Sequence, residues 1–186
     1  MRAGMMIPAS TARQNSNNGR HQRPHHFPEQ IAIMNLISKI LLPDNILLDS
    51  ESTSKKRVFE RVGLLFENNQ QIARSMVFDS LFAREKLGST GLGQGVAIPH
   101  GRISKLRDAT AAFVKTAHPI PFDAPDGMPV NLIFVLLVPD RATDLHLQIL
   151  GELAQMFSEA QFRDHLLACE DTASIHRLFY DWNSGA

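Results

Sequence analysis

The 186-residue sequence has one cysteine, no long apolar run and no excess of either charge. Cys169 cannot form an internal disulfide and lacks the partners for a zinc cluster, which fits a reducing compartment. The longest apolar run, LIFVLLV at 132–138, is far too short to cross a bilayer. These absences predict a cytoplasmic protein without membrane insertion.

The balance of charges argues against a nucleic-acid role. The chain holds 19 basic and 19 acidic side chains. Four of the basic residues and only one of the acidic residues lie in the first 30 positions. The remainder of the chain is therefore slightly acidic and offers no basic field for a nucleic acid.

The N-terminal segment differs in composition from the rest. Residues 1–33 are rich in Asn, Gln, Ser, Pro and His, and they hold too little apolar surface to offset the entropy of ordering. An Arg-rich targeting peptide and a His-rich metal-binding tract are alternatives, but the segment shows no periodicity that favours either. We predict a disordered extension over 1–33 and one folded domain over 34–186.

From Met34 onward, helical and extended patterns follow one another. The helix over 52–70 has Ser52 or Thr53 as its candidate N-cap, and the next helix ends at Gly88. Helices before and after a set of strands predict an α/β fold with a sheet between two helical layers. The predicted helices are 52–70, 72–88, 143–158, 159–169 and 171–182, and the predicted strands are 95–99, 109–117 and 130–139, with a short edge strand near residue 46.

The stretch GVAIPHG, at 95–101, presents an imidazole. Pro99 has no backbone N–H and should stop the strand ladder. His100 is then expected at the carboxyl end of the strand, where α/β sheets gather ligands. Gly101 should let the backbone turn away without crowding the ring.

A glycine-rich loop, LGSTGLGQG, precedes this stretch. Such a loop can direct successive N–H groups inward as an anion-binding nest, with Ser89 and Thr90 adding hydroxyl donors. Glycine-rich turns between a helix and a strand are also common without any ligand. The loop alone therefore leaves the choice between a phosphate-binding site and a simple connection open.

The run from Glu85 through LGQGVAIPHG resembles the signature of the enzyme IIA components of the bacterial phosphotransferase system, fructose and mannitol type. The longer stretch REKLGSTGLGQGVAIPHGR is most similar to the nitrogen-regulatory branch, and the resemblance covers about 34–182. It implies an α/β sandwich with a mixed sheet and no cofactor. It further implies that His100 becomes a tele-phosphohistidine, with the phosphoryl group coming from a histidine-containing phosphocarrier protein. Sensor kinases or potassium transport proteins are the implied regulatory targets.

Two further residues are candidates for the site. Val77, Leu81 and Arg84 share one helical face, which directs Arg84 toward the glycine loop; the alternative is a solvated arginine at a helix C-terminus. His146 faces the core side of its helix, near the start, where a neutral ring is favoured. The family places an arginine and a second histidine at these positions beside the phosphorylated histidine. With Ser89, Thr90 and Gly101 as phosphate-binding residues, they complete the predicted site.

Three other functions compete with this interpretation. A metal hydrolase could use His100 and His146 as ligands, but the sequence has no HExxH or HxH spacing. A regulatory binding module could keep the fold without phosphoryl transfer. A soluble IIA component of a sugar uptake system would need IIB and IIC partners on other chains.

Overall fold

The structure is a computed structural model that describes residues 35–49, 51–141 and 144–183. The predicted disordered extension over 1–33 lies outside these residues. Within the described ranges, no helix is long and apolar enough to cross a membrane.

Helices and strands follow in the order that the sequence patterns predict, with additional short elements. The helices are α1 (Leu36–Ile40), α2 (Lys55–Gln70), α3 (Arg74–Glu85), α4 (Asp144–Ser158), α5 (Ala160–Ala168) and α6 (Thr172–Asp181). The strands are β1 (Leu41–Asp49), β2 (Gly91–Gly93), β3 (Val96–Ala97), β4 (His100–Ile103), β5 (Thr110–Ile120) and β6 (Val130–Pro139).

Two of the predicted helix ends are wrong by a few residues. The N-cap of α2 is Ser54, whose hydroxyl accepts a hydrogen bond from the Arg57 N–H, rather than Ser52 or Thr53. The α3 helix ends at Glu85, with Lys86 as its C-cap, so Gly88 belongs to the loop. Glu85 is therefore the last residue of the helix, and the glycine loop begins after it.

The six strands form one mixed sheet. Its order is β1-β5-β6-β3-β2, and β4 also pairs with β6. The β5–β6 pair is antiparallel, whereas β1 runs parallel to β5, and β3 and β4 run parallel to β6. The expected mixed sheet and the edge strand near residue 46 are therefore confirmed.

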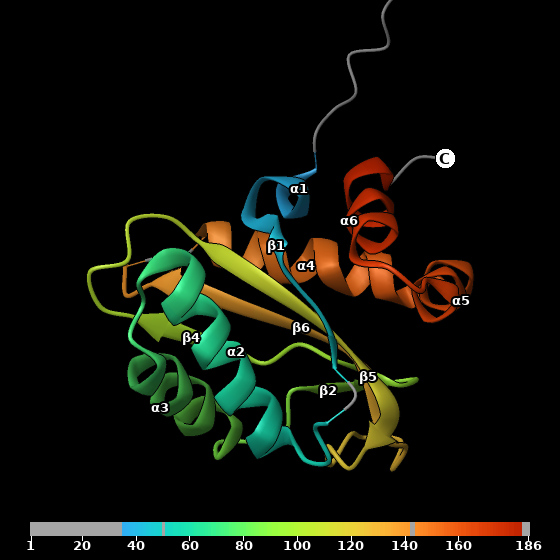
Figure 1. The fold of residues 1–186 in the computed structure, drawn as a ribbon, viewed down its shortest axis with the longest axis horizontal. Coiled ribbons are helices and arrows are strands. Elements are labelled where there is room, and N and C mark those ends of the chain that lie inside the picture. Colours follow the sequence, from blue (N-terminus) through green and yellow to red (C-terminus); the bar gives the residue numbers. More distant parts are fainter. Residues whose placement is uncertain (1–34, 50, 142–143, 184–186) are drawn as a thin grey trace, which may run out of the picture. The chain divides into compact units, whose positions relative to one another are not determined.

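Two apolar cores fill the spaces on either side of this sheet. One core joins α2 and α3 to one face, and the other joins α1, α4, α5 and α6 to the opposite face. In Figure 1, α2 and α3 lie in front of the strands while α4 runs behind them. The β6 strand is apolar and buried along nearly its whole length because helices cover both of its faces. The predicted sandwich is confirmed.

Candidate functional site

His100 begins a strand rather than ending one. Ala97 pairs with Ile133 on β6, and His100 pairs with Leu136 in the same register. Between them the Pro99 carbonyl still accepts a hydrogen bond from the Leu136 N–H at 2.9 Å. The prediction that the ladder stops at Pro99 is wrong, because proline removes only one donor and the chain resumes its pairing at the next residue.

Gly101 permits a close approach between β4 and α3, and the backbone does not turn away there as the sequence suggested. A Cβ at this position would lie 2.2 Å from Ser80 Oγ and 3.1 Å from Ser80 Cβ. The Ser80 hydroxyl donates to the Arg102 carbonyl at 2.8 Å and so joins α3 to the strand. Glycine therefore lets α3 lie against the strand that carries His100.

Replacing Gly101 with alanine should destabilise the protein by about 1–3 kcal/mol, because the added methyl group overpacks this contact. Urea unfolding measures the effect. Since the clash is with the Ser80 side chain, Gly101→Ala should cost less in a Ser80→Ala background than in the wild type. Additive costs in that double-mutant cycle would contradict the close-approach explanation.

The His100 ring is held by one hydrogen bond at each nitrogen. Its Nδ1 lies 2.9 Å from the Ile98 carbonyl oxygen, and its Nε2 lies 3.1 Å from Arg84 Nε. A carbonyl can only accept and a guanidinium can only donate. The contacts therefore select the neutral tautomer with the proton on Nδ1 and the lone pair on Nε2, so Nε2 is the nucleophilic atom.

Arg84 reaches the ring from the last turn of α3. Its Nη1 donates to the Gly88 carbonyl at 3.0 Å, while its Nε faces His100. The guanidinium thus bridges the glycine loop and the histidine. This placement matches the inward orientation inferred from the helical face that Arg84 shares with Val77 and Leu81.

His146 lies beside His100, on the first turn of α4. The two ring centroids are 5.3 Å apart and the rings meet at 65°. His146 Nε2 is buried and has no hydrogen-bond partner within the described residues. A buried polar atom without a partner is costly, and a bound phosphoryl oxygen could supply one here.

The environment keeps both rings neutral. Burial has the largest effect and lowers the pKa of His100; the hydrogen bond to the Ile98 carbonyl opposes this shift, the Arg84 charge adds to it, and the Glu85 charge opposes it. Burial also lowers the pKa of His146, followed by the effects of His100, Arg102 and Arg84. Both rings are thus available at neutral pH as uncharged groups, which a nucleophile requires.

These lowered pKa values predict a pH-dependent stability. Well above the usual histidine pKa of 6.5, both rings are neutral in the folded and in the unfolded protein, so they add no pH dependence to the free energy of unfolding. Below it, the unfolded chain binds protons that the folded chain resists, so the free energy of unfolding should fall as the pH drops. Urea unfolding between about pH 5 and 7 measures this slope, and it should be shallower in His100→Gln and His146→Gln. An unchanged slope in both variants would contradict the predicted protonation.

The Ser89 and Thr90 side chains are not directed to His100. The Ser89 hydroxyl donates to the Phe122 carbonyl at 2.6 Å, and the Thr90 hydroxyl donates to the Glu85 carboxylate at 2.6 Å. The Thr90 N–H also points to that carboxylate, at 3.1 Å. The predicted nest of successive N–H groups is not formed, because the Thr90 N–H donates to Glu85 and the next one, of Gly91, donates to the Ser89 hydroxyl at 3.1 Å.

Sequence reasoning missed two charged residues near the site. Arg102 lies two positions after His100 on β4, so both side chains emerge on one face, and this spacing could have revealed it. Its Nη1 donates to the Asp140 carbonyl at 2.6 Å. Glu85 is part of the quoted signature, but nothing in the sequence pattern indicates what its carboxylate contacts.

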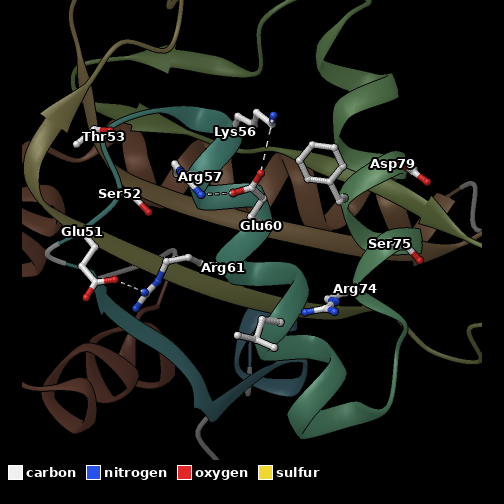
Figure 2. A pocket seen from close by; sticks show the side chains of 12 residues that line it. Glu51, Ser52, Thr53, Lys56, Arg57, Glu60, Arg61, Arg74, Ser75 and Asp79 are labelled. Atoms are coloured by element: carbon white, nitrogen blue, oxygen red, sulfur yellow. Dashed lines mark hydrogen bonds and ion pairs between the residues drawn. The ribbon is translucent and has the colours of Figure 1, made fainter.

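A groove between α2 and α3, with a volume of about 970 Å³, lies away from this site. Figure 2 shows its lining, which includes Lys56, Arg57, Arg61 and Arg74 but neither histidine. Each of these cations is within ion-pair distance of an acidic side chain. Lys56 and Arg57 share the Glu60 carboxylate, and Arg61 and Arg74 have partners of their own. Since the groove also lacks the paired histidines, the candidate site is the one at His100.

The described residues contain no cluster of three or more His, Cys, Asp and Glu side chains that could hold a metal ion. The Arg84 guanidinium also occupies the position beside His100 Nε2 where a metal cation would have to bind. Two histidines facing an arginine suit an anion better than a cation, and oxyanions such as carboxylate and phosphate are bound by guanidinium groups.

Comparisons with known proteins show the family to which the chain belongs. The family model described as "Phosphoenolpyruvate-dependent sugar phosphotransferase system, EIIA 2" matches residues 39–182. A nitrogen regulatory protein of Pseudomonas aeruginosa is 39% identical over 150 residues, covering 80% of this chain and 97% of the relative.

Solved structures agree with this match. The crystal structure of nitrogen regulatory protein IIA-Ntr from Neisseria meningitidis superimposes with a TM-score of 0.74 at 51% identity, covering 78% of this chain and 99% of that chain. IIA mannitol from Escherichia coli, at 18% identity and a TM-score of 0.61, covers 73% of this chain and 96% of that chain and shares the fold. The chain therefore belongs to the EIIA type-2 family of the phosphoenolpyruvate-dependent sugar phosphotransferase system, on the branch of the nitrogen regulatory proteins.

Proposed function

We propose that His100 accepts a phosphoryl group on Nε2 from a histidine-containing phosphocarrier protein, and that the phosphorylation state of the protein signals to regulatory targets. The observation that carries this proposal is the pair of hydrogen bonds at the ring. The Ile98 carbonyl holds the proton on Nδ1, and Arg84 lies at the lone pair of Nε2. The nucleophile is thereby oriented before a donor arrives.

In the proposed step, the Nε2 lone pair attacks the phosphorus of the donor phosphohistidine. A new N–P bond forms as the donor's N–P bond breaks, and that electron pair returns to the donor ring. The His100 ring becomes positively charged with its proton still on Nδ1, and the Ile98 carbonyl at 2.9 Å stabilises that charge. No proton has to move during the transfer.

The phosphoryl oxygens need positive charge and donors, since transfer depends mainly on positioning and electrostatic stabilisation. Arg84 can turn its guanidinium from the lone pair to these oxygens while keeping its contact with the Gly88 carbonyl. His146 can donate an N–H from Nε2, the buried atom that otherwise lacks a partner. The backbone around Gly101 remains the proposed source of further phosphate contacts, whereas the Ser89 and Thr90 hydroxyls, also predicted to bind phosphate, donate to Phe122 and Glu85.

A phosphoryl group adds up to two negative charges and can create or break an interface. Exposed apolar side chains occupy the elements that carry the site, including Phe82, Leu87, Leu145 and Leu147. A partner that covers them would detect this charge. By family resemblance, the proposed targets are sensor kinases or potassium transport proteins, and the proposed relay operates in the cytoplasm. A soluble IIA component for sugar uptake would use the same chemistry but would pass the group to a IIB protein.

The test is incubation of the protein with phosphoenolpyruvate, enzyme I and the phosphocarrier. We expect one acid-labile, base-stable phosphate per chain, and none when the phosphocarrier is left out. Absence of label would refute phosphoryl acceptance and would support a regulatory module that only binds. Rapid onward transfer to a fructose or mannitol IIB protein would favour the sugar-uptake function instead of the regulatory one.

A further inference from the structure

One buried charge beside the site has no part in the chemistry described so far. The Glu85 side chain is only 5% exposed, at the end of α3 and next to Arg84 in the sequence. Its Oε1 lies 3.1 Å from Lys55 Nζ, and its Oε2 accepts hydrogen bonds from the Thr90 N–H at 3.1 Å and the Thr90 hydroxyl at 2.6 Å. A carboxylate held by this many donors is fixed in place.

One chain of contacts leads from this carboxylate to His100 Nδ1. Glu85 holds Thr90 by both its backbone and its side chain. The Thr90 carbonyl accepts the Ile98 N–H at 2.9 Å. The Ile98 carbonyl then accepts the Nδ1 proton of His100. A shift of Thr90 therefore moves the group that sets the tautomer of the ring.

A second chain of contacts leads to His100 Nε2 through Arg84. The Glu85 carbonyl accepts the Gly88 N–H at 3.2 Å, and the Gly88 carbonyl accepts Arg84 Nη1 at 3.0 Å. The same guanidinium donates to His100 Nε2. Both hydrogen bonds that orient the ring thus depend on the glycine loop, but this second route runs through the Glu85 backbone carbonyl and only the first runs through its carboxylate.

Lys55 extends this support to the connection after β5. Its ammonium lies 2.6 Å from the Asp123 carboxylate and 3.5 Å from the Phe122 carbonyl, which also accepts the Ser89 hydroxyl. The contact between Lys55 and Glu85 therefore links Glu85 to the segment 122–123, to which the Ser89 hydroxyl also anchors the glycine loop. It also offsets the cost of burying the Glu85 charge.

We propose that Glu85 is a positioning residue, whose carboxylate holds Thr90 in the glycine loop so that the Ile98 carbonyl fixes the tautomer and orientation of His100. This proposal rests on the proposed phosphoryl acceptance for its kinetic consequence. Its structural consequence, the preferred position of the ring proton, can be measured without any phosphoryl donor.

Glu85→Gln is the decisive variant because it keeps the size of the side chain while removing its charge and one acceptor. In the wild type, the ¹⁵N shifts of the His100 ring should show the proton almost entirely on Nδ1. In Glu85→Gln, the preference should weaken toward a mixture, and the rate of phosphoryl transfer should fall about tenfold or more as the near-attack geometry is lost. Glu85→Asp, which retains the charge, should recover part of both losses.

Glu67→Gln is the matched control. Glu67 is an acidic residue of α2 that pairs with Arg74 at 3.6 Å, far along the chain from the loop. The change should alter neither the tautomer of His100 nor the rate of transfer. A purely structural loss of stability would also leave the ring proton in place in the folded molecules, so the tautomer separates positioning from folding.

Thr90→Val serves as the second variant if Glu85→Gln does not fold. It removes the hydroxyl that donates to Glu85 but keeps the backbone donor, so a smaller change of the same kind is expected. Wild-type tautomer and rate in every variant that folds would overturn the proposal. If the wild type accepts no phosphate, the proposed function fails, whereas the tautomer still decides the role of Glu85.

Discussion

Replacing His100 with alanine should reduce phosphate incorporation to background. The reason is that Nε2 of His100 combines an unprotonated lone pair, a fixed tautomer and an adjacent guanidinium. His146, the nearest second imidazole, has its Nε2 buried. Label from radioactive phosphoenolpyruvate, with catalytic amounts of enzyme I and the phosphocarrier, measures the effect.

His118→Ala is the control for this variant. His118 is exposed on β5, and its removal should leave incorporation unchanged. The unfolding midpoint of His100→Ala should remain close to that of the wild type, because the ring is only half buried. Label that persists in a folded His100→Ala protein would assign the acceptor to another residue.

Arg84→Ala should slow phosphoryl transfer by about 10²–10³-fold, the cost of removing one preorganised donor to developing charge. The guanidinium acts most strongly when the phosphoryl group is between donor and acceptor, so kcat should fall more than KM rises. Its removal should also raise the pKa of His100, because the Arg84 charge lowers that pKa in the wild type.

Rapid-quench measurement of transfer from the phosphorylated phosphocarrier tests this prediction. Arg84→Lys is the informative comparison, since it retains the charge but cannot engage the Gly88 carbonyl and the phosphoryl oxygens through a planar fork. It should recover only part of the rate. Unchanged kinetics in Arg84→Ala would place the guanidinium outside the mechanism.

The sequence predicts the layers of this fold well because the signal is strong where burial is complete. The β6 strand reads as a continuous apolar run, which only a strand covered on both faces requires. The α2 helix shows its buried side chains at helical spacing, including Val58, Val62 and Phe66. These patterns identify the apolar face of each helix and the strand that is buried on both faces. Packing these surfaces together produces the sheet between two helical layers.

The details around His100 could not be predicted in the same way, because they depend on contacts between distant segments. Nothing near Pro99 shows that β6 continues to offer a partner beyond it, so the return of pairing at His100 was missed. The need for glycine at 101 comes from Ser80 on another element. Likewise, the turn at Thr90 looks like a phosphate site until the Glu85 carboxylate is seen within it.

The candidate residues themselves were found by different routes. Periodicity placed Arg84 and His146 on inward faces, and the structure brings both beside His100. Only the resemblance to a known family supplied a reason to connect them with phosphate. The roles of Arg102 and Glu85 became visible only in the structure. The Arg102 charge lowers the pKa of His146, and the Glu85 carboxylate holds Thr90.

The most direct test of the account is the position of the phosphoryl group on the modified protein. Heteronuclear NMR of the phosphorylated, ¹⁵N-labelled chain identifies which histidine and which ring nitrogen carries the phosphorus. We expect phosphorus on Nε2 of His100, with the proton retained on Nδ1. Phosphorus on Nδ1 of His100, or on any other residue, would contradict it.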